Sequence, residues 1–244
     1  MSMGAPDRYT SSSAAFFGGV AASLTSVFFL VMIGTFVGIG ALAHGFGFSA
    51  WWLATSTVVV WAGPAQVILI SSLGSGGTMI DAAIAVTLSG VRLFPMVVAM
   101  LPLLRGDGTR TRDLLLPTHF TSVTTWVESL RLLPHLPHVR RVPFCNGLST
   151  GYMVTAVAAG FVGFYLAASL PPLLAGGLLF VTPLSFLCTT ARNARQILER
   201  LALGLGLGIE PVLTYFHVGL DLVWTGVGAG TIAYAVHRVR EATR

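Results

Sequence analysis

The stretch WWLATSTVVVWAGPAQVILISSL, residues 51–73, decides how this chain folds. It carries no charge and is long enough to cross the roughly 30 Å hydrocarbon core of a bilayer as a helix. Gly63 and Pro64 interrupt it near the middle, because proline lacks the amide hydrogen that a helix needs and its ring clashes with the preceding turn. Backbone groups freed at that depth are tolerated only where they pack against protein or line a polar cavity. The stretch therefore predicts a broken transmembrane helix whose break forms a solute site.

The composition extends the membrane prediction to the whole chain. Of its 244 residues, 54% are hydrophobic and only 9% are charged, whereas an average soluble domain has about 25% charged residues. Uncharged runs of about 20 residues recur, which is typical of membrane helices and not of barrel strands. We expect one all-α polytopic membrane domain over residues 1–244, with about seven transmembrane helices and a range of about six to eight. We expect the protein to lie in the cell inner or plasma membrane.

The basic residues predict the orientation of the chain. All of them besides histidine are arginines, and in a membrane chain such an excess indicates orientation and not nucleic acid binding. By the positive-inside rule, the basic segment 105–143 is cytoplasmic, and so is the C-terminus, which follows Arg238 and Arg240. Within that segment, residues 118–133 predict an amphipathic helix with Glu128 and Arg131 three residues apart.

The remaining apolar runs predict further helices. Residues 16–44 form either one tilted helix or a half-helix followed by a full one, and the last part holds two short helices joined near Pro211 or near His217. The other predicted spans are residues 81–104, 145–169 and 173–190.

An internal similarity links the two halves of the chain. Pro183 lies in the span 173–190 much as Pro64 lies in residues 51–73, which predicts pseudo-repeats over about 16–104 and 145–236 with opposite orientation. Inverted repeats with broken helices bind solute in many secondary transporters, and the N-terminus of a half-helix suits a carboxylate. No metal or other cofactor is expected. The candidate substrate-binding residues are Ala62, Gly63, Pro64, Gln66, Thr182, Pro183 and Ser185.

Two charged residues are candidates for a role in transport. Arg92 lies within the apolar run 81–104, where it either extends to the interface or faces the interior as a counter-charge. Glu210 adjoins Pro211 in an apolar neighbourhood. It is a candidate for proton coupling if it is buried, because burial raises the pKa of a carboxyl group, and a solvated residue if it lies in an external loop.

Three short elements carry a resemblance to a known family. Residues 61–66 are Trp-Ala-Gly-Pro-Ala-Gln, residues 90–93 are Gly-Val-Arg-Leu, and His119 and Phe120 form a third element. These elements resemble the AzlC family, whose pattern has a Phe-Ala-Gly-Ala-Ser-Gln-like break, an Asn-Leu-Arg-His-like element and a His-Phe element. The resemblance covers residues from about 18 to 236, and Ala62, Gly63, Gln66 and Arg92 carry over. The chain departs from the pattern at Pro64, Ala65, Gly90 and Leu93, and it lacks the acidic residues that follow the His-Phe element.

The resemblance implies a function and a partner. AzlC proteins are the large subunits of two-component exporters for branched-chain amino acids, which implies export driven by the proton motive force together with a small AzlD-type membrane subunit. Two alternatives stay open: an accessory or scaffold subunit without its own solute path, and a channel or exporter for a different small anion. An enzyme is not expected, since the sequence offers no paired intramembrane carboxylates, metal-ligand pair or activated nucleophile.

Overall fold

The structure, a computed structural model, describes residues 9–106, 108–169, 171, 174, 184, 187, 188, 191, 197–216 and 221–242. Every regular element in those residues is helical, as expected from the sequence. In chain order these elements are α1 (Ser12–Thr25), α2 (Val27–Gly45), α3 (Ala50–Val59), α4 (Gly63–Gly74), α5 (Met79–Gly90), α6 (Leu93–Leu104), the 3-10 helix η1 (Thr111–Leu114), α7 (Leu115–His119), α8 (Val123–Leu132), the 3-10 helix η2 (Leu133–His135), α9 (His138–Ser169), α11 (Ile197–Tyr215) and α12 (Asp221–Ala242).

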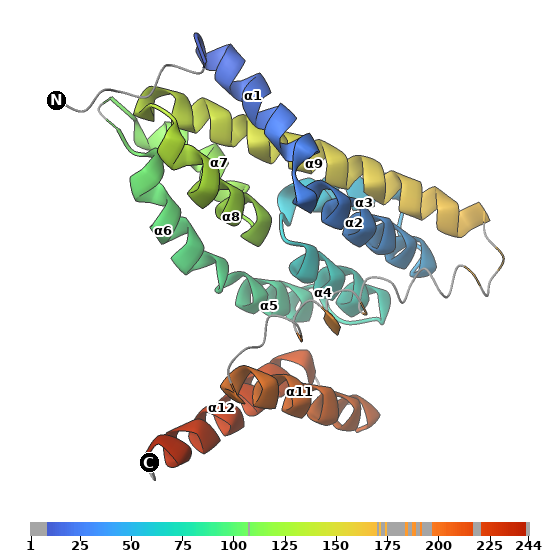
Figure 1. The fold of residues 1–244 in the computed structure, drawn as a ribbon. Helices are drawn as coiled ribbons and strands as arrows, with labels where there is room; N and C mark the ends of the chain where they lie inside the picture. Colours follow the sequence, from blue (N-terminus) through green and yellow to red (C-terminus); the bar gives the residue numbers. More distant parts are fainter. Residues whose placement is uncertain are drawn as a thin grey trace.

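Helix α9 is the element against which most of the others pack. It contacts α1, α2, α3, α6, α7 and α8, and Figure 1 shows α1 and α2 lying along it. Its 32 residues make a helix of about 48 Å, which is longer than a bilayer core is thick. Helices α11 and α12 pack mainly on each other, and α12 also contacts α5.

Glycine allows α2 to approach α9 closely. A Cβ atom at Gly40 would collide with the backbone carbonyl of Gly160, and one at Gly163 would collide with the carbonyl of Val37. Gly34, on another side of α2, faces open space. Small residues on one stripe let helix backbones meet where lipid removes the hydrophobic driving force, so this contact is typical of a membrane bundle.

Three of the apolar runs are broken in the structure. Ser26 separates α1 from α2, so residues 16–44 form a half-helix and a full helix, which is one of the two expected alternatives. Residues 60–62 separate α3 from α4, as predicted. The run 81–104, predicted as one span, is a bent pair in which α5 and α6 meet at an angle of 48°, and the bend was not predicted. Pro95 explains the bend, since it lies four residues after Val91 and cannot donate to its carbonyl.

One other boundary differs from the prediction, and another agrees with one of its two alternatives. Helix α9 begins at His138 and not at Cys145, so its first turns belong to the basic segment assigned to 105–143. Its start is held by Arg141, which donates to the carbonyl oxygens of Leu136 and Leu103, each at 2.9 Å, so the boundary depends on tertiary contacts. Helix α11 continues through Pro211 and ends at Tyr215, and α12 begins at Asp221, which agrees with the alternative of a join near His217.

The amphipathic helix expected within residues 118–133 is present as α8. It packs on α6 and α9, and its Glu128 and Arg131 form the expected ion pair.

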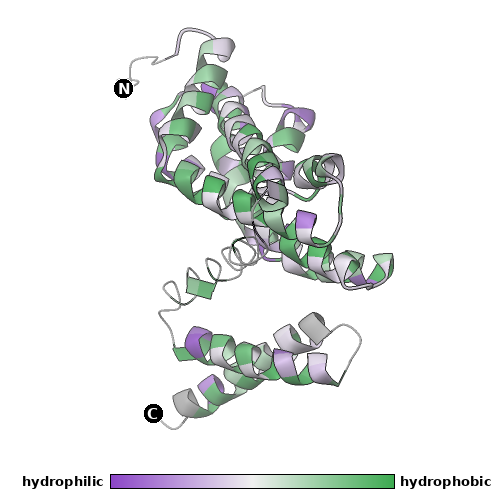
Figure 2. Cartoon of the chain, turned by 90° about the vertical axis from the view of Figure 1, so that its right-hand side faces the viewer, coloured by the Kyte–Doolittle hydropathy of each residue, from purple (hydrophilic) through white to green (hydrophobic). Residues whose placement is uncertain are grey.

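The length and apolar character of each helix show which helices could cross a membrane. Within the described residues, α2 and α9 are long and apolar enough to cross a bilayer, and the bent pair α5 and α6 makes a third span if it is counted as one. Helices α1 and α4 are apolar but have only 14 and 12 residues. Figure 2 shows hydrophobic residues along the helices of the bundle. The protein is thus a helical membrane protein, while seven helices and an inverted repeat stay predictions.

Candidate functional site

The break between α3 and α4 follows from the position of Pro64. Proline at this position cannot donate a hydrogen bond to the carbonyl of Val60, and its ring would clash with that carbonyl in a continuous helix. Val60 therefore leaves the helix at φ −104° and ψ 78°, and Ala62 is extended at φ −156° and ψ 115°. Helix α4 restarts with Gly63 and Pro64 in its first turn, so the chain breaks where the sequence predicted.

The start of α4 presents backbone donors. The first amide groups of a helix have no acceptor within it, and none of the described side chains caps this end. The amide of Ala62 donates to the carbonyl of Val60 at 2.9 Å, and Pro64 has no amide hydrogen. The amides of Gly63 and Ala65 are left at the positive end of the α4 dipole, an arrangement that suits a carboxylate.

Gln66 joins the two halves of the broken helix. Its side chain is fully buried, and its amide nitrogen donates to Thr57 Oγ1 at 2.7 Å and to Ser56 Oγ at 3.1 Å. Both hydroxyl groups in turn donate to the carbonyl of Leu53, at 2.8 and 2.9 Å. Gln66 Oε1 is buried and has no hydrogen-bond partner among the described residues. The break therefore holds one free acceptor beside the donors of α4.

Aromatic rings form an apolar wall at the break. Trp61, with 5% of its surface exposed, stacks on Phe36 at a centroid distance of 6.3 Å and meets Phe120 edge to face at 5.7 Å. Trp61 Nε1 is buried without a hydrogen-bond partner among the described residues. Buried polar atoms are normally paired, so an unpaired donor and an unpaired acceptor at one break point to water or a ligand between the helices.

The His119 side chain pairs with a backbone carbonyl at the end of α3. The carbonyl of Val58 would accept from the amide of Ala62 in a continuous helix, but that amide turns to Val60. His119 Nε2 lies 3.0 Å from the Val58 oxygen, and because a carbonyl only accepts, this nitrogen is the donor. His119 comes from the end of α7, 61 residues away.

Sequence reasoning missed several residues of this arrangement. The hydroxyl groups of Ser56 and Thr57, the rings of Trp61 and Phe120, and the His119 side chain were not among the candidates. The available signal for His119 and Phe120 was their resemblance to a family element, which marked the pair without saying what it contacts.

The other candidates lie elsewhere. Arg92 occupies the N-cap position of α6 at a different break, makes no side-chain capping hydrogen bond there, and is exposed. Glu210 lies in α11, where its Oε1 accepts from Thr214 Oγ1 at 3.0 Å. Thr182, Pro183 and Ser185 lie outside the described residues. The structure thus brings together Ala62, Gly63, Pro64 and Gln66.

The family model described as AzlC protein matches residues 27–170, from the start of α2 through α9. The matched region contains the break between α3 and α4, Arg92, and the His119 and Phe120 pair. No curated protein and no solved structure matches the chain. Because the family match spans more than half of the 244 residues, the chain belongs to the AzlC family.

Proposed function

We propose that this protein is a membrane transporter that exports branched-chain or other hydrophobic amino acids by alternating access. The observation that carries the proposal is the break between α3 and α4, where uncapped backbone donors adjoin the unpaired buried atoms of Gln66 and Trp61. Membership of the AzlC family supports a transport-related membrane protein and not an enzyme. The proposed location is the cell inner or plasma membrane, with the C-terminus in the cytoplasm.

The proposed binding mode matches each part of an amino acid to a group at the break. The substrate carboxylate accepts from the amides of Gly63 and Ala65, and hydrogen bonds to a charged group are worth about 1.5–3 kcal/mol each. The substrate ammonium donates to Gln66 Oε1, the acceptor without a partner. The apolar side chain packs on the wall formed by Trp61 and Phe120. No metal or cofactor takes part in this mode.

The proposal extends to the second half of the chain and to a partner. From the sequence alone, we propose that Thr182, Pro183 and Ser185, which lie outside the described residues, supply the matching break of an inverted repeat and complete the substrate site. Arg92 is the candidate counter-charge, and Glu210 is the coupling candidate taken from the sequence. A small AzlD-type membrane subunit assembles with this chain.

Transport by the purified protein tests the proposal. Proteoliposomes that contain the chain and its small partner subunit are loaded with labelled leucine or valine, and efflux is followed as the internal concentration rises. We expect saturable efflux that Gln66→Ala removes. Thr87→Ala is the matched control, because the Thr87 hydroxyl bonds only a carbonyl of its own helix, that of Ala83 at 2.7 Å.

The same experiment separates the alternatives. Flux that does not saturate, or that carries other small anions equally well, identifies a channel or an anion exporter. Unchanged efflux when this chain is omitted identifies an accessory subunit without its own path. Each of these results overturns the proposal, and so does normal efflux by the Gln66→Ala variant.

A further inference from the structure

The helix pair α5 and α6 lies along one side of the bundle and turns one face away from it (Figure 1). On the inner face, α5 packs on α4 and α6 packs on α8 and α9, and the buried residues are Ala82, Ala85, Met100 and Leu104. The opposite face carries exposed residues spaced alternately four and three apart, here called the outer stripe: Ile84, Leu88, Val91, Pro95, Val98 and Pro102. This spacing is typical of a surface along which a second helix packs lengthwise.

Arg92 flanks the outer stripe at the bend between the two helices. It is exposed, and it makes no hydrogen bond or ion pair with any residue that the structure describes. The apolar residues of the stripe fit lipid as well as protein, so they do not by themselves require a partner. Arg92 on the same surface does require one, because an unpaired charge in hydrocarbon is costly.

The position of Arg92 keeps its charge away from both membrane surfaces. About 19 Å of helix separate it from Met79, where α5 begins, and about 18 Å separate it from Leu104, where α6 ends. The hydrocarbon core is about 30 Å thick, so Arg92 lies near its middle when α5 and α6 cross as one span. An arginine side chain is shorter than either distance, so it does not extend to the headgroups.

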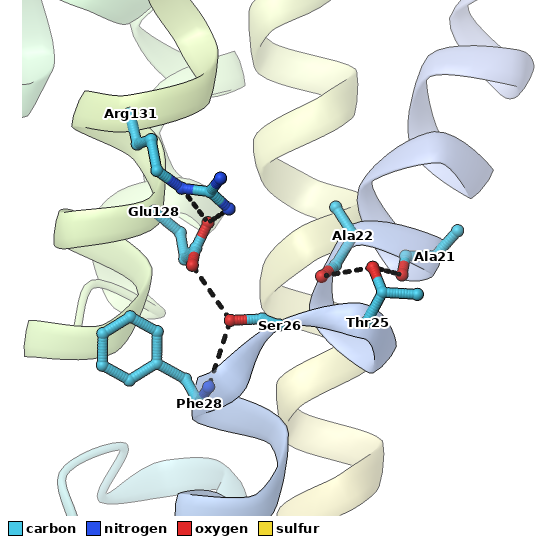
Figure 3. A network of polar contacts seen from close by, with 7 residues as sticks. All are labelled: Ala21, Ala22, Thr25, Ser26, Phe28, Glu128 and Arg131. Carbon is cyan, nitrogen blue, oxygen red and sulfur yellow. Dashed lines mark hydrogen bonds and ion pairs between the residues drawn. The ribbon is translucent and has the colours of Figure 1, made fainter.

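The buried carboxylate of this chain is already occupied. Glu128 of α8 is the only acidic residue with a buried side chain among those that the structure describes. Its Oε2 accepts from Nε of Arg131 at 3.1 Å, and its Oε1 accepts from the Ser26 hydroxyl at 2.9 Å (Figure 3). Glu128 therefore has its own arginine and does not neutralise Arg92.

The other apolar segments of the chain do not supply a counter-charge either. Glu210 of α11 accepts from Thr214 Oγ1 at 3.0 Å, and Asp81 forms a capping box with Thr78 at the start of α5, at one end of the span. The sequence from 170 to 196 contains no acidic residue. A second copy of the chain, packed symmetrically along the same stripe, would bring a second arginine and no acid to the interface.

We infer that the outer stripe is the interface for a membrane helix of a second, different polypeptide, and that a carboxylate at mid-depth in that helix pairs with Arg92. The inference rests on the proposed function, which assigns this chain a small membrane subunit, and that subunit carries the helix. The start of α6 beside Arg92 has no side-chain cap, so its dipole adds to the attraction for a negative group. The apolar stripe excludes water from the pair, and the pair fixes the register of the partner helix.

Site-specific cross-linking tests the position of the interface. The photoreactive residue p-benzoylphenylalanine replaces Phe94, an aromatic residue beside the stripe with 71% of its surface exposed, in a chain co-expressed with the small subunit. The matched control replaces Tyr165, an aromatic residue of α9 that is 60% exposed. We expect a product with the combined mass of the chain and the subunit from position 94 and not from position 165. A product with two copies of the chain, or equal yields of the subunit product at both positions, overturns the inference.

Charge exchange tests the ion pair. Loss of one partner of a shielded charge pair weakens binding by at least about tenfold, so Arg92→Gln should reduce co-purification of the small subunit by that factor. Arg112→Gln removes an exposed arginine of the basic segment and should leave co-purification unchanged. Arg92→Glu should abolish it, and arginine in place of the partner's carboxylate should restore it. Each carboxylate within the subunit's apolar helices is replaced in turn, and a misfolded variant would not be restored by a change in another chain.

The outcomes separate this inference from the proposed function. A wild-type chain that does not co-purify with the small subunit contradicts the partner that the proposed function assigns, and the inference with it. Co-purification that Arg92→Gln leaves unchanged overturns the inference alone. So does failure of every charge exchange to restore Arg92→Glu, or a subunit without a carboxylate in its apolar helices.

Discussion

Replacement of Gln66 by leucine separates a substrate contact from a structural bridge. Leucine is close in size to glutamine and apolar, so it fills the same space without donating or accepting hydrogen bonds. If Gln66 Oε1 binds the substrate ammonium, Gln66→Leu should abolish saturable leucine transport while the fold persists.

The structure gives the magnitude of the effect on stability. The variant loses two hydrogen bonds, to Thr57 and Ser56, which together contribute about 1–3 kcal/mol. Both hydroxyl groups keep a partner, because each still donates to the carbonyl of Leu53. The variant also removes Gln66 Oε1, whose burial without a partner costs about 1–3 kcal/mol. The two contributions oppose each other, so the free energy of unfolding should change by no more than about 2 kcal/mol in either direction.

Two measurements on the same preparation check this expectation. Thermal unfolding in detergent should show a shift in apparent melting temperature within about 8 °C, because about 1 kcal/mol gives a shift of about 2–4 °C in a chain of this size. Efflux of labelled leucine from proteoliposomes should be lost. Normal efflux refutes the substrate contact, and a large fall in melting temperature that parallels the loss of efflux shows that Gln66 acts only as a bridge between α3 and α4.

Three further predictions concern packing and the break. Gly40→Ala should destabilise the bundle by about 1–3 kcal/mol, because its Cβ would overlap the backbone of α9, whereas Gly34→Ala in the same helix faces open space; equal melting temperatures for the two variants would contradict the packing. His119→Ala should cost about 0.5–1.5 kcal/mol by removing the donor to the Val58 carbonyl, and His119→Gln should recover most of it; a glutamine variant as unstable as the alanine variant would argue against the capping role. Trp61→Phe keeps an aromatic ring and removes a buried donor without a partner, so stability should hold or rise while the KM for leucine increases; an unchanged KM would exclude the indole nitrogen from the site.

The residues at the breaks show how far sequence reasoning reached. The break at Pro64 was predictable, because proline prevents a hydrogen bond four residues earlier whatever its tertiary surroundings. Pro95 has the same relation to Val91, yet the prediction of a span over 81–104 included no bend there, although the local signal was present. A break within residues 16–44 was one of two alternatives, and its position at Ser26 was not predicted, since a serine within an apolar run fits both a continuous helix and a cap.

The roles of the polar side chains were harder to predict. Gln66 was placed at the break from its position alone, but its contacts with Ser56 and Thr57 depend on how α3 and α4 fold back on each other. Glu128 and Arg131 were predicted as a pair three residues apart, and the structure adds that the carboxylate is buried. Burial of one face of α8 depends on α6 and α9, and no pattern within α8 specifies those neighbours.

The sequence by itself determined the helical membrane class and the break at Pro64, because apolar run length and proline sterics act within a few residues of chain. Only the tertiary structure decided which polar groups meet. His119 reaches Val58 across 61 residues, and Glu128 reaches Ser26 across 102. Such contacts depend on how several helices pack around α9, and that packing depends on surfaces that are far apart in the chain and become neighbours only in the folded protein.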